Sequence, residues 1–172
     1  MIEKFNWKMK EQDKESWRRV VSSPTPQFLF NGNSIKHMME FGTIVIAAGG
    51  GGIPAYIKED KGLRLVDGVI DKDMTSALLA RIVKSEEFFI ITDVAHVCLN
   101  YGTDDVKKIH KSSLQEMKKW LSEGHFQEGT MKPKIEAAIY FLEHHGEKVI
   151  ITSIDNIEKA IKGKSGTIIE KV

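Results

Sequence analysis

The sequence has a single cysteine, Cys98, among its 172 residues, and its formal net charge is only +1. One cysteine excludes an intramolecular disulfide and fits a reducing compartment, so we expect a cytoplasmic protein. The small net charge gives no electrostatic basis for binding nucleic acid or an anionic membrane. No apolar run approaches the ~20 residues that span a bilayer, and the polar N-terminus lacks the apolar segment of a signal peptide.

The sequence also lacks internal repeats, low-complexity tracts and a clear interdomain linker, which favours one domain. It is 41% hydrophobic and 28% charged, a balance typical of a globular protein. Apolar strand patterns alternate with helical ones almost throughout. This alternation predicts an α/β fold, with a mostly parallel sheet covered by helices. The predicted strands are 43–48, 88–92, 94–99, 148–151 and 167–169, and a hairpin-like excursion joins 55–57 to 63–66. The predicted helices run from Asn33 or Ser34 to Phe41, from Asp71 or Asp73, from Ser112 or Ser113 to Leu121, and over 134–144 and 156–161.

A run of glycines is the most informative motif. The apolar stretch Thr43–Ala48 is followed directly by Gly49, Gly50, Gly51 and Gly52. Glycines allow positive φ angles and let backbone N–H groups approach an anion closely. Ligands of open α/β sheets bind beyond the carboxyl ends of strands. The run therefore predicts a loop that binds a phosphate or another small anion, with a flexible turn as the alternative.

Two lysine motifs occur at predicted helix starts. In Asp71-Lys72-Asp73, an aspartate caps a helix, or Lys72 contacts a phosphate while Asp73 orients it. In Gly129–Lys134, Pro133 suits the first turn of a helix. Lys134 would then lie at the positive end of the helix dipole, where a bound anion would offset its unfavourable position. The alternative for each lysine is a solvated side chain.

Other motifs carry no chemistry that we can identify. Gly163–Thr167 resembles the end of a P-loop, but position 158 is glutamate where that motif needs glycine. The six histidines show no metal-binding spacing, and we interpret each of them as structural or exposed. Cys98 stands in an apolar stretch and is interpreted as a core residue rather than a nucleophile.

Several segments together resemble carbamate kinases of the amino-acid kinase superfamily. They are WRRVVSSPTP, AAGGGGIP, VIDKDMTSALLA, ITDV, NYGT, GHFQEGTMKPKIEAAI and ITSIDN. Their order and spacing agree from about Phe5 to the C-terminus, and it is the combination that is specific. The resemblance implies reversible phosphoryl transfer between ATP and carbamate, which gives ADP and carbamoyl phosphate and serves arginine catabolism.

The resemblance also implies roles for individual residues. Lys72 and Lys134 would hold phosphates, Asp73 would orient these lysines, and Mg²⁺ would bridge phosphate oxygens. The glycines from Gly49 to Gly52 would bind carbamate or the transferred phosphoryl group. The nucleotide pocket would include Thr92, Asp93, Tyr101, Gly129 and Met131. Where many relatives have an acid after TDV or TGV, this sequence has Ala95, so its affinity for nucleotide could be lower, or the change could be neutral.

Carbamate kinases carry a long N-terminal part that has no counterpart here. The resemblance therefore implies a single partial domain, incomplete at its N-terminus. Residues 1–32 would be the remnant of a protruding subdomain, and residues 33–172 would be the nucleotide-binding part. The resemblance also implies a homodimer. An open sheet edge with an uncovered apolar face predicts that the chain self-associates or is marginally stable. The alternative function is a truncated module that binds adenine nucleotide without catalysis.

Overall fold

The computed structural model describes residues 7–13, 16–50, 52–60 and 62–171. Its main sheet has four strands in the order β5 (Glu87–Thr92), β9 (Lys148–Ser153), β10 (Thr167–Glu170) and β8 (Lys111–Ser113). The β5–β9 and β10–β8 pairs are parallel, and the β10–β9 pair is antiparallel. The expected mostly parallel sheet is therefore confirmed.

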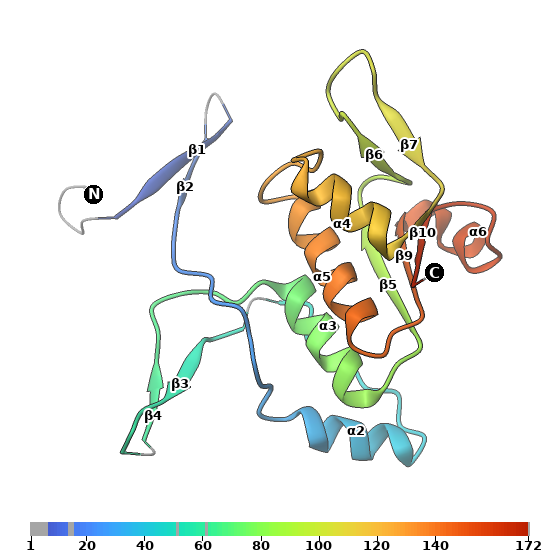
Figure 1. The fold of residues 1–172 in the computed structure, drawn as a ribbon. Helices are drawn as coiled ribbons and strands as arrows, with labels where there is room; N and C mark the ends of the chain where they lie inside the picture. The colour runs from blue at the N-terminus through green and yellow to red at the C-terminus, as the bar shows by residue number, and fades with distance from the viewer. Residues whose placement is uncertain (1–6, 14–15, 51, 61, 172) are drawn as a thin grey trace.

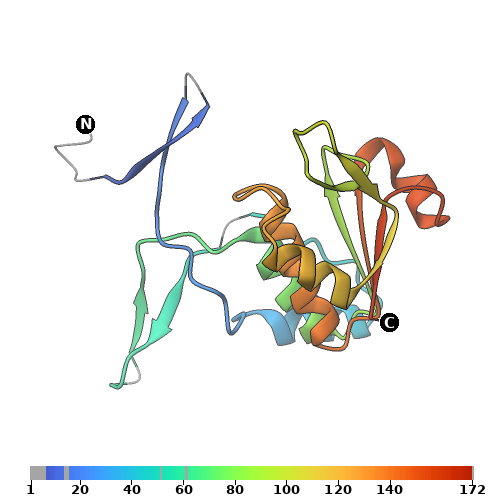
Figure 2. The same cartoon turned by 45° about the horizontal axis from the view of Figure 1, so that its top comes forward.

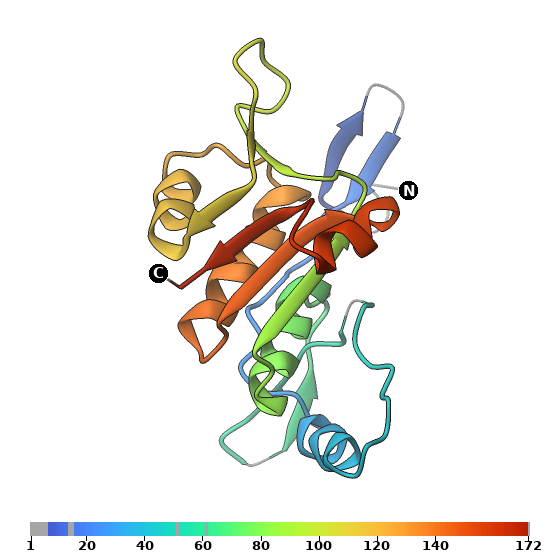
Figure 3. The same ribbon diagram turned by 90° about the vertical axis from the view of Figure 1, so that its right-hand side faces the viewer.

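Three helices cover one face of this sheet (Figures 1 and 3). They are α3 (Lys72–Val83), α4 (Leu114–Ser122) and α5 (Met131–Glu143), and α5 packs against both of the others. The short helix η1 (Ile154–Asn156) and α6 (Ile157–Ile161) follow β9, and α6 lies on the opposite side of the sheet. The largest fully buried side chains are mostly from α4, α5 and β9, among them Phe141, Met117, Ile135 and Leu142.

The N-terminal part of the chain has little contact with this core. Helix α2 (Gly32–Glu40) packs on α3, where a Cβ added to Gly32 would lie 2.7 Å from Cδ1 of Ile82. The hairpins β1 (Met9–Asp13)–β2 (Ser16–Arg19) and β3 (Ala55–Ile57)–β4 (Leu63–Leu65) project away from the sheet (Figures 1 and 2). A third hairpin, β6 (Val97–Leu99)–β7 (Lys107–Ile109), extends from the end of the main sheet.

The prediction of a strand over residues 43–48 is wrong for this structure. The segment pairs with no strand that the structure describes, and Ile44 and Ile46 are 94% and 99% exposed. An apolar β-rich pattern shows that a segment is suited to a buried strand, but a strand forms only where a neighbour supplies hydrogen bonds. The predicted strand over residues 94–99 is likewise reduced to β6.

The helix boundaries were predicted with mixed success. Asp71 caps α3 and Ser113 caps α4 with a full capping box, as expected. Helix α2, however, begins after Asn31, which makes no side-chain capping bond, rather than after Asn33 or Ser34. Helix α5 begins at Met131, three residues earlier than predicted. In the part of the chain that the structure describes, no helix is both long and apolar enough to cross a membrane.

Candidate functional site

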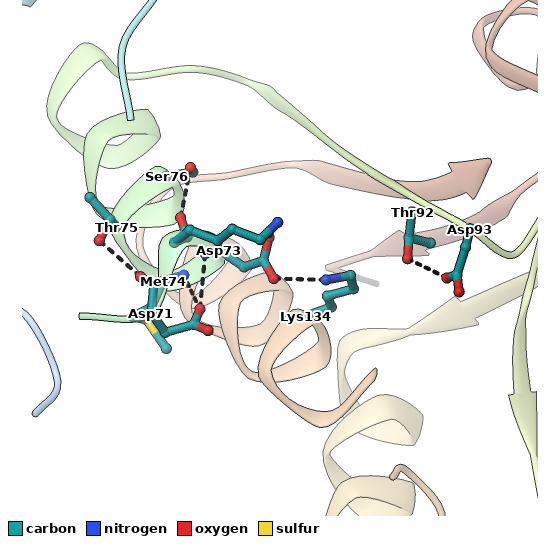
Figure 4. Close-up of polar contacts among 9 residues, drawn as sticks. Asp71, Asp73, Met74, Thr75, Ser76, Thr92, Asp93 and Lys134 are labelled. Atoms are coloured by element: carbon teal, nitrogen blue, oxygen red, sulfur yellow. Dashed lines mark hydrogen bonds and ion pairs between the residues drawn. The ribbon is translucent and has the colours of Figure 1, made fainter. Parts of the chain in front are cut away.

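The side chain of Asp71 caps the start of helix α3 (Figure 4). Asp71 has an extended backbone, and its Oδ1 accepts hydrogen bonds from the backbone N–H groups of Asp73 (2.9 Å) and Met74 (3.0 Å). These bonds satisfy two of the orphan donors of the helix. Asp71 is thus a structural cap. The carboxylate of Asp73, two residues later, takes no part in the cap and is available to contact other side chains.

Asp73 pairs with both lysines that the sequence analysis singled out. Its Oδ2 lies 2.9 Å from Nζ of Lys134, and its Oδ1 lies 3.5 Å from Nζ of Lys72. The side chains of Asp73 and Lys134 are only 13% and 14% exposed, whereas that of Lys72 is 51% exposed. One carboxylate therefore holds two ammonium groups that come from different helices. The cluster keeps one net positive charge, which an incoming anion would meet.

The start of helix α5 contrasts with that of α3. Thr130, the N-cap residue, makes no side-chain capping bond, and the first turn contains no acidic residue. Lys134 is the fourth helical residue, at the end of this first turn. The positive end of the helix dipole and the Lys134 ammonium group thus both favour the binding of an anion at the start of α5.

A cavity of about 620 Å³ opens beside this helix start. Its walls come from the end of β5, the β6–β7 hairpin and the loop that leads into α5. It therefore lies beyond the carboxyl end of a parallel strand, where open α/β sheets bind ligands. Its size is in the range of small-molecule sites in proteins.

Most of the sequence-predicted site residues gather around this cavity. Lys134 lines it together with all five residues expected at a nucleotide pocket, namely Thr92, Asp93, Tyr101, Gly129 and Met131. Lys72 and Asp73 join this group through the contact between Asp73 and Lys134. Figure 4 shows Lys134 between Asp73 on one side and Thr92 with Asp93 on the other. The Thr92 hydroxyl donates to Oδ1 of Asp93 over 2.9 Å, which fixes that carboxylate.

Gly52 of the glycine run lies next to the start of α3, and none of the described glycines of this run lines the cavity. The backbone N–H of Ile70 donates to the carbonyl of Gly52 over 3.0 Å, which places Gly52 close to Asp71 and Lys72 in space. Gly49 has a φ of +84°, as the sequence analysis anticipated for such a loop. Gly50 has open space around it, and Gly51 lies outside the described residues. The anion-binding role of these glycines stays a prediction.

The structure adds cavity residues to which the sequence analysis gave no place in a binding site. His96, Cys98, Lys108 and His125 all line the cavity, as does Ala95. The ring of His96 packs edge-on against that of His110, with 4.6 Å between centroids. Burial lowers the pKa of His96, and the neighbouring charges of His110 and Lys108 lower it further. Sequence spacing offered little signal, because His96 lies before strand β6 and His125 comes from another segment of the chain.

Within the described part of the chain, no group of three or more His, Cys, Asp or Glu side chains is arranged to hold a metal ion. The one pair of close imidazole rings, His96 and His110, has no acidic or thiol partner that completes such a group.

Comparisons with known proteins agree with this geometry. The model of the amino acid kinase family matches residues 6–153. A carbamate kinase from Thermoplasma acidophilum is 43% identical over 166 residues, which are 96% of this chain and 54% of that protein. Carbamate kinase 3 of Staphylococcus aureus is 47% identical over 161 residues, or 93% of this chain and 52% of that protein.

A solved structure shows the same fold. It is the carbamate kinase from Giardia lamblia bound to AMP-PNP, which is 37% identical and superposes with a TM-score of 0.86. The match covers 98% of this chain and 54% of the Giardia chain. The chain thus spans about half the length of the relatives that it matches.

Proposed function

Because this chain belongs to the amino acid kinase family, we propose that it forms the nucleotide-binding part of a carbamate kinase. In the complete reaction, a phosphoryl group passes reversibly between ATP and carbamate. The observation that carries the proposal is the convergence of Lys134, Lys72 and Asp73 at the edge of a cavity of nucleotide size. The Giardia relative that holds AMP-PNP, at 37% identity, supports a nucleotide as the ligand.

The contacts suggest how the site would act. Phosphoryl transfer needs positioned substrates and neutralised charge more than covalent participation by the protein. Lys134 would bind the phosphate oxygens that lie at the start of α5, and Lys72 would reach them from α3. Asp73 would hold both ammonium groups in place before the nucleotide arrives. Mg²⁺ carried on the phosphate oxygens would neutralise further charge during transfer.

Two forms of the function are distinguishable. In the first, the chain is active together with a polypeptide that supplies the rest of the kinase domain. The segment 43–48, with Ile44 and Ile46 almost fully exposed, supports this form, because its apolar pattern suits pairing with a further strand. In the second, the chain binds adenine nucleotide and does not catalyse. Because the chain spans only about half the length of these relatives, nucleotide binding is tested before catalysis.

The first experiment is calorimetric titration of ADP and ATP, with Mg²⁺ present, into the folded chain. We expect binding, and we expect Lys134→Ala to weaken it by at least about tenfold, since hydrogen bonds to charged groups contribute roughly 1.5–3 kcal/mol. Lys132→Ala is the matched control. Lys132 is on the same helix, pairs with Glu128 and does not line the cavity. A folded chain that binds neither nucleotide, or equal effects of the two substitutions, would overturn the proposal.

A second experiment separates the two forms. The chain is co-expressed with the part of a carbamate kinase relative that it does not match, and ATP formation from ADP and carbamoyl phosphate is followed. Activity that disappears with Lys134→Ala identifies a kinase active in the presence of the other part. Nucleotide binding without any activity in a stable complex supports the non-catalytic module.

A further inference from the structure

Two segments that line the cavity are joined by one side-chain pair. Asn100 directly follows strand β6 and starts the turn that carries Tyr101, while His125 begins the loop that leads to Gly129 and Met131. Nδ1 of His125 lies 2.8 Å from Oδ1 of Asn100, and the pair is partly buried. We propose that Asn100 and His125 are positioning residues that set the spacing of the two nucleotide-binding loops. This inference rests on the proposed function of the cavity.

The neighbours of Asn100 determine the direction of this hydrogen bond. Its Nδ2 group points to the backbone carbonyl and the carboxylate of Asp105, at 3.4 Å from each. Its Oδ1 is therefore free to accept, and the proton of the shared bond belongs to Nδ1 of His125. The amide thus connects the far end of the Tyr101 turn to the imidazole of His125.

Asn100 also fixes the turn through its own backbone. Its φ of +52° lies in the left-handed region, which asparagine tolerates better than most residues. Its carbonyl accepts from the backbone N–H of Thr103 (3.2 Å) and from the Thr103 hydroxyl (2.9 Å). The turn is consequently a defined unit, and moving Asn100 would move Tyr101 with it.

His125 is held from its other side as well. Its Nε2 lies 3.3 Å from Oε2 of Glu123, and its backbone N–H donates to the carbonyl of Trp120. Both ring nitrogens serve as donors at once when the imidazole is protonated, and the Nδ1 contact persists in the neutral ring. The next residue, Phe126, is 5% exposed and anchors the loop in the core. The pair therefore connects a turn at the end of β6 to a loop that is already fixed.

Two conservative substitutions separate the two contacts of His125. Asparagine places an amide nitrogen near the position of Nδ1, so His125→Asn retains the bond to Asn100 and loses the contact with Glu123. Glutamine places its amide near Nε2, so His125→Gln retains the contact with Glu123 and loses the bond to Asn100. His125 also lines the cavity, so both variants can lower the affinity, and the test is the difference between them. If the bond positions the loops, His125→Gln binds ADP roughly three- to tenfold more weakly than His125→Asn, as expected for one hydrogen bond.

The measurements are ADP affinity by calorimetry, thermal unfolding of each variant and amide hydrogen exchange across residues 100–105 and 126–131. We expect the two variants to have similar melting temperatures, with faster exchange of the Tyr101 turn in His125→Gln only. Equal affinities with equal exchange, or a larger loss in His125→Asn, would overturn the inference. Exchange is measured without nucleotide, so it tests the pair even if the wild-type chain binds no ADP, a result that would refute the proposed function instead.

Discussion

Apolar side chains are mostly buried in one region of this molecule and mostly exposed in the other. In the compact region, residues 71–170, apolar side chains from α3, α4, α5 and the main sheet form one continuous core. In the outer region, the described residues from 7 to 70, Ile70 alone belongs to the buried hydrophobic set. There Phe41, Ile44, Ile46 and Ile53 are between 78% and 99% exposed.

The contrast shows that the burial of an apolar side chain depends on the elements that pack against it as much as on the residue type. The Ile residues of β9 and those of segment 43–48 are chemically identical, but β9 has a strand on each side and helices over one face. The candidate site follows the same division. Lys134, Asp73 and the cavity belong to the compact region, while the glycine run belongs to the outer region and meets the site only near Ile70.

The largest effect is expected for a core aromatic residue. Phe141 on α5 is fully buried and packs against Phe88 with 5.4 Å between ring centroids. Phe141→Ala should lower the free energy of unfolding by about 3–5 kcal/mol, since it removes buried contacts and leaves a cavity. Urea unfolding followed by circular dichroism measures this change.

The matched control for Phe141 is a phenylalanine of the outer region. Phe41 is 89% exposed, so Phe41→Ala should change the free energy of unfolding by less than about 0.5 kcal/mol. Similar losses for the two substitutions would show that the outer region is packed in solution, and the comparison between the regions would fail.

An intermediate effect is expected for the site carboxylate. Asp73→Ala leaves the ammonium group of Lys134, which is 14% exposed, without its partner. We expect a loss of about 1–3 kcal/mol, the usual penalty for an unsatisfied buried polar group. The double variant with Lys134→Met should recover part of this loss, because it removes the stranded charge.

The control for Asp73 is an exposed ion pair of the outer region. Asp67 pairs with Arg19 over 3.0 Å, but its side chain is 84% exposed. Asp67→Ala should therefore cost at most about 1 kcal/mol. A loss at Asp67 as large as that at Asp73 would contradict the difference in burial between the two pairs.

Much of the compact region could be predicted from the sequence, because its signals are local. Asp71 and Ser113 are capping residues whose partners lie two or three positions away, and the chain geometry alone brings them together. The amphipathic pattern of α5 likewise needs only a core to pack on. Lys134 and Asp73 are 61 positions apart, so predicting their contact required the family resemblance in addition to the predicted helix starts.

Other features depend on distant pairing, which a single sequence does not encode in readable form. Segment 43–48 has the composition of a strand but no described neighbour, and its exposure follows from that. His125 contacts Asn100 through a loop arrangement set by β6 and α4, and no spacing rule links these two residues. His96 likewise lines the cavity from the segment before β6, a position that no strand periodicity indicates.

A smaller effect is expected at the helix caps. The Ser113 hydroxyl accepts from the backbone N–H of Glu116, and the Glu116 carboxylate in turn accepts from the backbone N–H of Ser113. Ser113→Ala should cost about 1 kcal/mol in urea unfolding. Asn31 precedes α2 in the outer region and makes no side-chain capping bond, so Asn31→Ala should cost less than about 0.5 kcal/mol. A larger loss at Asn31 would reveal a cap in solution that the structure does not show.

The smallest effect on stability is expected where the apolar surface is most exposed. Ile44→Ser and Ile46→Ser should change the free energy of unfolding by less than about 0.5 kcal/mol, because these side chains are 94% and 99% exposed. The same substitutions should reduce self-association, since an unpaired apolar segment favours contact between copies. Light scattering over a range of concentrations measures this association, with Lys58→Ser, a polar position in the same region, as the control. A wild-type chain that stays monomeric at every concentration would contradict the expected association. A loss of stability in the serine variants would instead show that residues 43–48 are already paired within the molecule.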